Sequence, residues 1–179
     1  MTVTTEPSAT TTRTTTARTP VPGTPPISGT ARLARRPTAP RPRAAEDSRW
    51  TALVESVRDA GQYPTAREAE RITRIVLSAL GGQLIGEERV ALARALPEEA
   101  ARVIASQIPA TRRLTAAEFV DSVATRIEGA TPATARWDVS SVLSVLPPLL
   151  GESLTTRILM ELPRGYALLF GRADLGPRR

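Results

Sequence analysis

The side chains that could do chemistry in this chain are carboxylates, hydroxyls and guanidinium groups, because the 179 residues include no His, Cys or Lys. This composition excludes Ser-His-Asp triads, thiolate nucleophiles, Schiff-base lysines and most transition-metal sites. Acid–base catalysis near neutral pH would have to use carboxylates or a tyrosine. The candidates are two glutamate pairs and three single residues: Glu87 with Glu88, Glu98 with Glu99, Asp121, Asp138 and Tyr166.

Neither glutamate pair has the spacing of a catalytic or metal-binding site. Adjacent residues on a helix point about 100° apart, so their carboxylates do not converge on one ligand. One pair follows Gly86 and the other follows Pro97, which places all four glutamates in first helical turns, where negative charge complements the helix dipole. We therefore assign no catalytic residue, no metal ligand and no cofactor, and expect that the protein is not an enzyme.

The elements that carry these residues form a duplicated unit. Residues 50–104 and 116–170, which stand 66 positions apart, align without a gap and share thirteen of 55 residues. The shared residues are mainly apolar and include Val54/Val120, Val57/Val123, Ala69/Ala135, Val76/Val142, Leu77/Leu143 and Leu80/Leu146. Positions of this kind build a core, so the sequence indicates a repeated packing scheme.

Apolar spacing of three and four residues predicts four short helices in each half. The first helix is expected to begin near Ser48, and in the second half at Thr115, which forms a capping box with Glu118. The second helix is expected to begin at Thr65 and at Thr131.

Glycine and proline mark the remaining boundaries. The second helices are expected to stop at Gly81-Gly82 and at Pro147-Pro148. Third helices are expected over residues 87–95 and 152–161, and fourth helices after Pro97 and Pro163.

These patterns predict an all-α protein made of a duplicated four-helix unit, about eight short helices in total. The folded domain is expected over residues 49–170, with repeats at about 49–105 and 115–170. One repeat alone would be only marginally stable, so we expect the two to pack together with pseudo-two-fold symmetry. A flexible basic tail is expected over residues 171–179.

The first 48 residues contain thirteen Thr and eight Pro and few large apolar side chains, so we expect a disordered N-terminal arm. The arm carries the excess positive charge, since residues 49–170 contain fourteen Arg and fourteen acidic residues. Five arginines form a cluster suited to a polyanion: Arg32, Arg35, Arg36, Arg41 and Arg43. A solubilising linker and a targeting segment are the other interpretations of this arm.

The two tryptophans are candidates for an interaction anchor, because exposed aromatic side chains concentrate binding energy. Trp137 is the better candidate, since it stands off the apolar stripe of its helix. A place in the core or at its rim is the favoured interpretation for both, and Trp50 lies on an apolar stripe.

A set of motifs in both halves carries a family resemblance: Val76-Leu77-Ser78-Ala79-Leu80, Gly86-Glu87-Glu88, Leu96-Pro97-Glu98-Glu99, Glu118-Phe119 with Val123, Val142-Leu143, and Leu162-Pro163-Arg164-Gly165-Tyr166 with Leu169-Phe170. Through them the chain from residue 50 to 170 resembles the bacterial domain-of-unknown-function family 2267, typically a tandem helical duplication. It departs from the family in having Ala95 and Glu161 where Gln is common. The resemblance implies an all-helical, cytosolic protein of actinobacterial type and carries over no catalytic residues.

We therefore expect a cytoplasmic, non-enzymatic helical module that binds another protein and carries a basic N-terminal arm. Nucleic-acid or other polyanion binding through the arm is the first alternative. An enzyme that uses only carboxylates and hydroxyls is the second. No apolar run is long enough to predict a membrane span.

Overall fold

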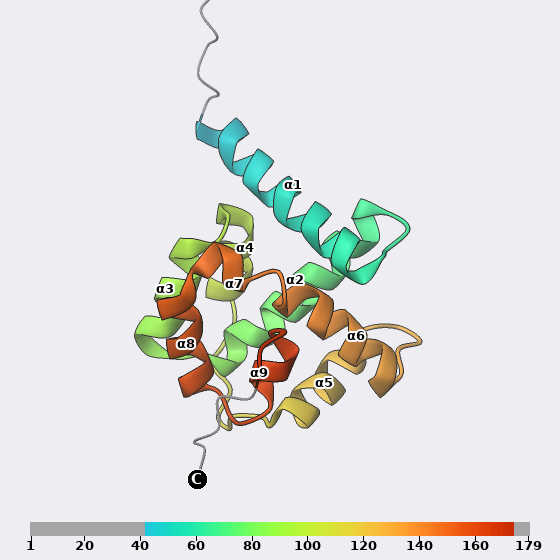
Figure 1. The fold of residues 1–179 in the computed structure, drawn as a ribbon, viewed down its shortest axis with the longest axis vertical. Coiled ribbons are helices and arrows are strands. Elements are labelled where there is room, and N and C mark those ends of the chain that lie inside the picture. Colours follow the sequence, from blue (N-terminus) through green and yellow to red (C-terminus); the bar gives the residue numbers. More distant parts are fainter. Residues whose placement is uncertain (1–41, 174–179) are drawn as a thin grey trace, which may run out of the picture. The chain divides into compact units, whose positions relative to one another are not determined.

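A computed structural model describes residues 42–173, and within this range all regular structure is helical (Figure 1). The all-α prediction is confirmed. The helices of the first half are α1 (Pro42–Gly61), α2 (Ala66–Gln83), α3 (Gly86–Ala95) and α4 (Glu98–Ala105). Those of the second half are α5 (Ala116–Ala124), α6 (Pro132–Leu143), α7 (Pro147–Leu150), α8 (Glu152–Glu161) and α9 (Tyr166–Leu169).

The predicted helix starts at threonine are confirmed. The Thr115 hydroxyl accepts a hydrogen bond from the Glu118 amide, and the Glu118 carboxylate accepts one from the Thr115 amide, which completes a capping box. Thr131 caps α6 in the same reciprocal way with Thr134, and Pro132 takes the first helical position. These bonds satisfy backbone donors that a helix leaves unpaired at its start.

The predicted start of the first helix at Ser48 is wrong, because α1 begins at Pro42. The two extra turns are polar, so apolar spacing could not reveal them. A contact with the rest of the domain holds them, since Glu46 Oε2 accepts a hydrogen bond from the Glu98 amide at 3.1 Å. Just after them, Arg49 Nη2 donates to the Ala95 carbonyl at 3.4 Å. Residues 1–41 and 174–179, which hold most of the predicted arm and tail, lie outside the described residues.

The predicted helix stop at Gly81-Gly82 is also wrong, because both glycines lie inside α2. A Cβ atom at Gly81 would come within 2.9 Å of the Ile104 carbonyl oxygen and 3.0 Å of the Ile104 Cα atom. Gly81 therefore permits a close approach of α2 to the backbone of α4, which is a packing role.

In the second half, two helix boundaries differ from those predicted at Pro147 and Pro163. The helix α6 ends at Leu143, and Pro147 begins the separate turn α7, an addition to the eight helices expected. The last helix begins at Tyr166, three residues after Pro163, because Gly165 adopts a left-handed conformation with φ of 94°. The third helix of this half keeps its predicted bounds, residues 152–161.

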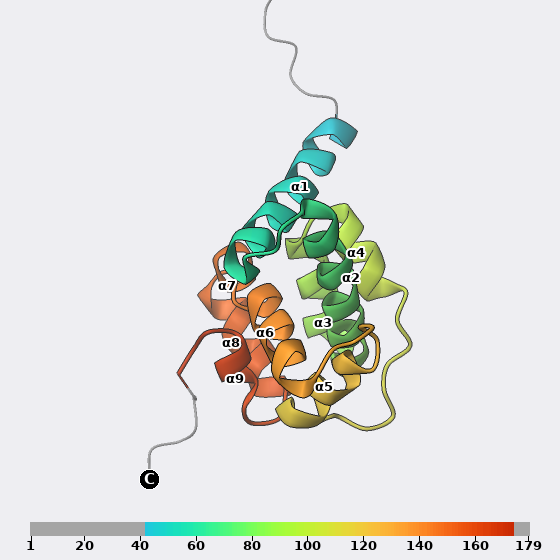
Figure 2. The same cartoon turned by 90° about the vertical axis from the view of Figure 1, so that its right-hand side faces the viewer.

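The helix α2 is the centre of the packing. It contacts α1, α4, α5 and α6, and it lies between α6 and α4 in Figure 2. Helices from the two predicted repeats also meet elsewhere, as α3 with α8 and α1 with α6 (Figure 1). One apolar cluster joins buried side chains of both halves, including Leu77, Phe119 and Leu143. The two halves therefore share one core, while their pseudo-two-fold relation stays a prediction.

None of the helices in the described part of the chain is long and apolar enough to cross a membrane.

Candidate functional site

The residues considered for acid–base chemistry are dispersed over the domain. Glu87 and Glu88 lie in the first turn of α3, and the other glutamate pair lies in the first turn of α4, as predicted. Asp138 accepts a hydrogen bond of 2.6 Å from the Tyr63 hydroxyl. The fully buried Tyr166 donates one of 3.2 Å to the Leu114 carbonyl. Residues 42–173 contain no group of three acidic side chains placed to hold a metal ion.

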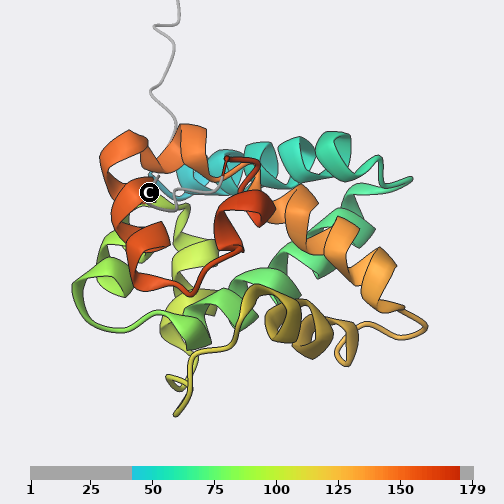
Figure 3. The same ribbon diagram turned by 60° about the horizontal axis from the view of Figure 1, so that its bottom comes forward.

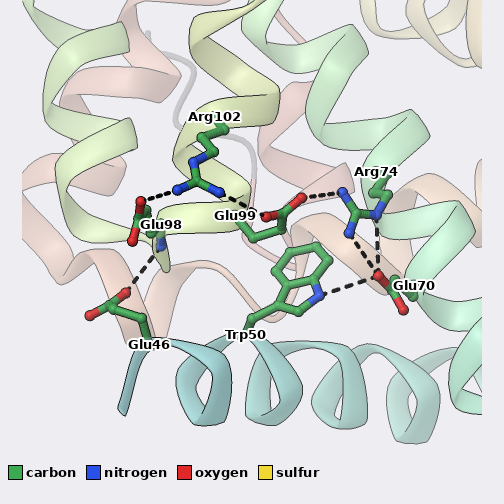
Figure 4. A network of polar contacts seen from close by, with 7 residues as sticks. All are labelled: Glu46, Trp50, Glu70, Arg74, Glu98, Glu99 and Arg102. Atoms are coloured by element: carbon green, nitrogen blue, oxygen red, sulfur yellow. Dashed lines mark hydrogen bonds and ion pairs between the residues drawn. The ribbon is translucent and has the colours of Figure 1, made fainter. Parts of the chain in front are cut away.

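A network of charged side chains joins α1, α2 and α4 around a hollow of about 250 Å³ (Figure 4). At its centre, Arg74 donates to Glu99 at 2.5 Å and to Glu70 at 2.8 Å. The Arg74 guanidinium carbon lies 5.0 Å from the centre of the Trp50 ring, a cation–π contact. The Trp50 indole N–H points to Glu70 Oε1 at 3.4 Å, so the indole is held on two sides.

The pKa shifts in this network follow from the ion pairs. The Arg74 hydrogen bonds lower the pKa of Glu70, and the Glu99 hydrogen bond raises the pKa of Arg74. The Arg49 hydrogen bond lowers the pKa of Glu46, with a further contribution from the Glu98 amide. Groups that are stabilised in their charged forms by fixed partners are suited to holding helices together and unsuited to exchanging protons near neutral pH.

The exposure of this network limits its contribution to stability. The side chains of Arg74, Glu70 and Glu99 are 39%, 38% and 33% exposed. We expect replacement of Arg74 by methionine to lower the free energy of unfolding by about 1 kcal/mol or less, because solvent screens exposed ion pairs. Urea unfolding of the native protein and of the Arg74→Met variant would measure this difference in free energy. A double-mutant cycle with Glu99→Gln that gave a coupling energy above about 2 kcal/mol would contradict this expectation.

The structure describes only two of the residues that the sequence predicted for interaction, Trp137 and Arg43. Trp137 is 55% exposed, and its indole nitrogen donates to the Gly61 carbonyl at 3.1 Å, so the ring packs on the end of α1. Its role as an anchor stays a prediction. Arg43 is exposed on the first turn of α1. The other four arginines of the cluster lie outside the described residues: Arg32, Arg35, Arg36 and Arg41.

A second hollow is apolar and lies where α5, α6 and α9 come together. This groove has a volume of about 480 Å³. Val120 and Leu169 are buried beneath it, and Leu168, which is 56% exposed, lines it together with alanines, Pro132 and Gly165. The exposed side chains of Asp121 and Arg136 are the charged groups of its lining. In Figure 3 the dark red α9 lies beside the orange α6, the two helices that bound one side.

The groove and the charged network occupy matching places in the two halves of the sequence. Four pairs of residues that line them stand 66 positions apart: Trp50 and Ala116, Glu70 and Arg136, Glu99 and Gly165, Arg102 and Leu168. Sequence reasoning missed the groove because its lining is mostly small, chemically plain residues. The signal that could have found it was the exchange of Trp50 for alanine at the matching position of the other half.

Comparison with known proteins connects this architecture to one family. A search of curated proteins finds no match to the chain. Residues 50–169 match the model of a family described as "Uncharacterized conserved protein (DUF2267)". This span includes α2 to α9 and all but the first two turns of α1. The protein, whose groove and charged network both lie largely within this span, therefore belongs to the DUF2267 family.

Proposed function

We propose that the protein is a non-enzymatic helical module that binds another protein through the groove between α5, α6 and α9. The observation that carries this proposal is the groove itself, an open hollow of about 480 Å³ on the surface of the domain. Apolar hollows with a few charged groups at the edge are typical of binding sites. The half-exposed Leu168 adds an accessible apolar side chain to it.

The arrangement of the polar side chains supports binding over catalysis. The Tyr166 hydroxyl is buried and bonded to a backbone carbonyl, Asp138 accepts a short bond from Tyr63, and Glu70 and Glu99 are held by Arg74. A general base must reach a substrate proton. In the groove lining, Asp121 is the single carboxylate that is accessible for this, and the other charged group there is Arg136.

Photo-crosslinking from the groove tests this function. A photoreactive amino acid at Leu168 is expected to give a defined adduct with a second protein in an extract of the source organism. The same amino acid at Met160, which is 80% exposed on α8, serves as the matched control. A second variant, Ala116→Trp, places an indole where Trp50 stands in the other half and is expected to abolish the adduct by filling the groove.

Three results would overturn the proposal. They are the absence of any adduct from Leu168, the same set of adducts from Met160, and an adduct that persists in the Ala116→Trp protein. Thermal unfolding of each variant verifies that it is folded, so that loss of an adduct can be attributed to the groove.

A further inference from the structure

We propose that the groove between α5, α6 and α9 binds a short acidic helix of a partner protein, which inserts one aromatic side chain beside Ala116. This inference rests on the proposed function and specifies the chemistry of the partner. It follows from three differences between the groove and the charged network that occupies the matching place in the first half.

The first difference concerns the space for a side chain. In the first half the Trp50 indole lies in the site, with Glu70 at its N–H and Arg74 against its ring. In the second half the matching residue is Ala116, and Gly165 stands where the first half has Glu99. A methyl group and a hydrogen atom replace two large side chains, so the groove offers the volume that an aromatic ring fills in the other half.

The second difference concerns the cover over the site. Two helical turns of α1, residues 42–49, precede Trp50 and contact the start of α4 through Glu46. The matching residues 108–115 are not helical, since α5 begins at Ala116. Two arginines of this segment pair elsewhere, Arg112 with Glu118 and Arg113 with Glu161. The second half therefore lacks the two helical turns that cover the charged network in the first half. A short helix is the element that would take their place over the groove.

The third difference is a reversal of charge. Glu70 and Glu98 of the first site correspond to Arg136, which lines the groove, and to Arg164, which adjoins the lining residue Gly165; both arginines are exposed. Neither arginine forms an ion pair with any residue between 42 and 173. Asp121 is the acidic residue in the groove lining. Arg136 in the lining and Arg164 next to the lining residue Gly165 have no ion-pair partner among residues 42–173, which favours a partner with negative charges around its aromatic residue.

These features together describe the binding of an amphipathic helix in a groove, in which an anchoring aromatic side chain supplies affinity and charges supply selectivity. A second copy of this protein would use the same space without needing an acidic helix. It is therefore a distinct outcome of the test.

The probe is a synthetic helix-forming peptide of alanine and glutamate with one central tryptophan. Two matched peptides replace every glutamate by lysine or the tryptophan by alanine. Backbone amide shifts of the full-length protein, followed by NMR during titration, are expected to change saturably in α5, α6 and α9 with the acidic tryptophan peptide. Its dissociation constant is expected to be about tenfold lower than that of either matched peptide.

Variants of the protein locate the interaction. Ala116→Trp is expected to abolish binding of the acidic peptide, and the pair Arg136→Glu with Arg164→Glu to weaken it about tenfold. Arg94→Glu, an exposed arginine in the last turn of α3, is the control and is expected to leave binding unchanged.

The inference is overturned if the acidic and basic peptides bind equally, if the tryptophan makes no difference, or if no peptide shifts the groove amides. It is also overturned if the groove mediates a dimer that Ala116→Trp dissociates. A crosslink from Leu168 that needs an open groove, combined with no preference for acidic peptides, would refute the acidic helix and leave the proposed function standing.

Discussion

Replacement of Gly81 by alanine is expected to lower the free energy of unfolding by about 2 kcal/mol. The added Cβ atom would lie 2.9 Å from the Ile104 carbonyl oxygen and 3.0 Å from its Cα atom, and both belong to the backbone of α4. Backbone atoms cannot move aside as a flexible side chain can, so α2 and α4 would have to separate. The loss is expected even though alanine favours a helix over glycine by up to about 1 kcal/mol.

The neighbouring Gly82 provides a matched control for this effect. It lies in the same turn of α2, and its nearest contact for an added Cβ is the Ile108 carbonyl oxygen at 3.7 Å, an ordinary van der Waals distance. Gly82→Ala is therefore expected to stabilise the protein by about 0.5 kcal/mol through helix propensity alone. Urea unfolding of both variants measures the contrast. Equal effects at the two positions would show that the approach of α4 does not determine the choice of glycine.

The two glycines also show where sequence reasoning about the fold reaches its limit. A glycine pair at the end of an apolar stripe is a common helix stop, and nothing local distinguishes it from a glycine that admits a neighbouring helix. The threonine caps were predictable, because Thr115 and Thr131 form their bonds within three residues of the chain. The bounds of α8 were predictable for the same reason, since Gly151 and Pro163 lie next to its ends.

The start of α1 depended on distant contacts that no local pattern contains. Residues 42–49 are polar, and they pack through the bond from the Glu98 amide to Glu46 and the bond from Arg49 to Ala95, between residues about fifty positions apart. Composition alone assigned residues 42–48 of this segment to the arm.

The groove was hidden for a related reason, since it consists of what Ala116 and Gly165 leave unfilled. Its presence could be inferred from the sequence only by asking what Trp50 and Glu99 do in the other half.

Alkaline pH is expected to destabilise the protein steeply through its two tyrosines. Burial is the main cause that raises the pKa of Tyr63 above its ordinary value of 10, and the hydrogen bond to Asp138 raises it further. Burial also raises the pKa of Tyr166, with a smaller contribution from the charge of Glu118. Each tyrosine therefore keeps its proton in the folded protein at a pH where the unfolded chain releases it.

The sign of the effect follows from this difference. A raised pKa in the folded state contributes stability that is fully present below pH 10 and is lost as the pH rises above that value. Each tyrosine can lower the free energy of unfolding by up to about 1.4 kcal/mol per pH unit in this range. Because the chain has no Lys, Cys or His, and arginine stays charged, no other side chain titrates between about pH 7 and 12. The expected profile is flat from pH 7 to 9 and then falls by about 2 to 4 kcal/mol by pH 12.

Urea unfolding at each pH measures this profile, and tyrosinate absorbance of the folded protein reports ionisation directly. Tyr63→Phe and Tyr166→Phe are each expected to remove about half of the alkaline slope. The second variant also costs about 1 kcal/mol at neutral pH, because the Leu114 carbonyl loses its donor. The double variant should unfold with a nearly constant free energy from pH 8 to 12. If it kept the slope of the native protein, the tyrosines would not be its cause, and ionisation of folded tyrosine near pH 10 would contradict the raised pKa of both tyrosines.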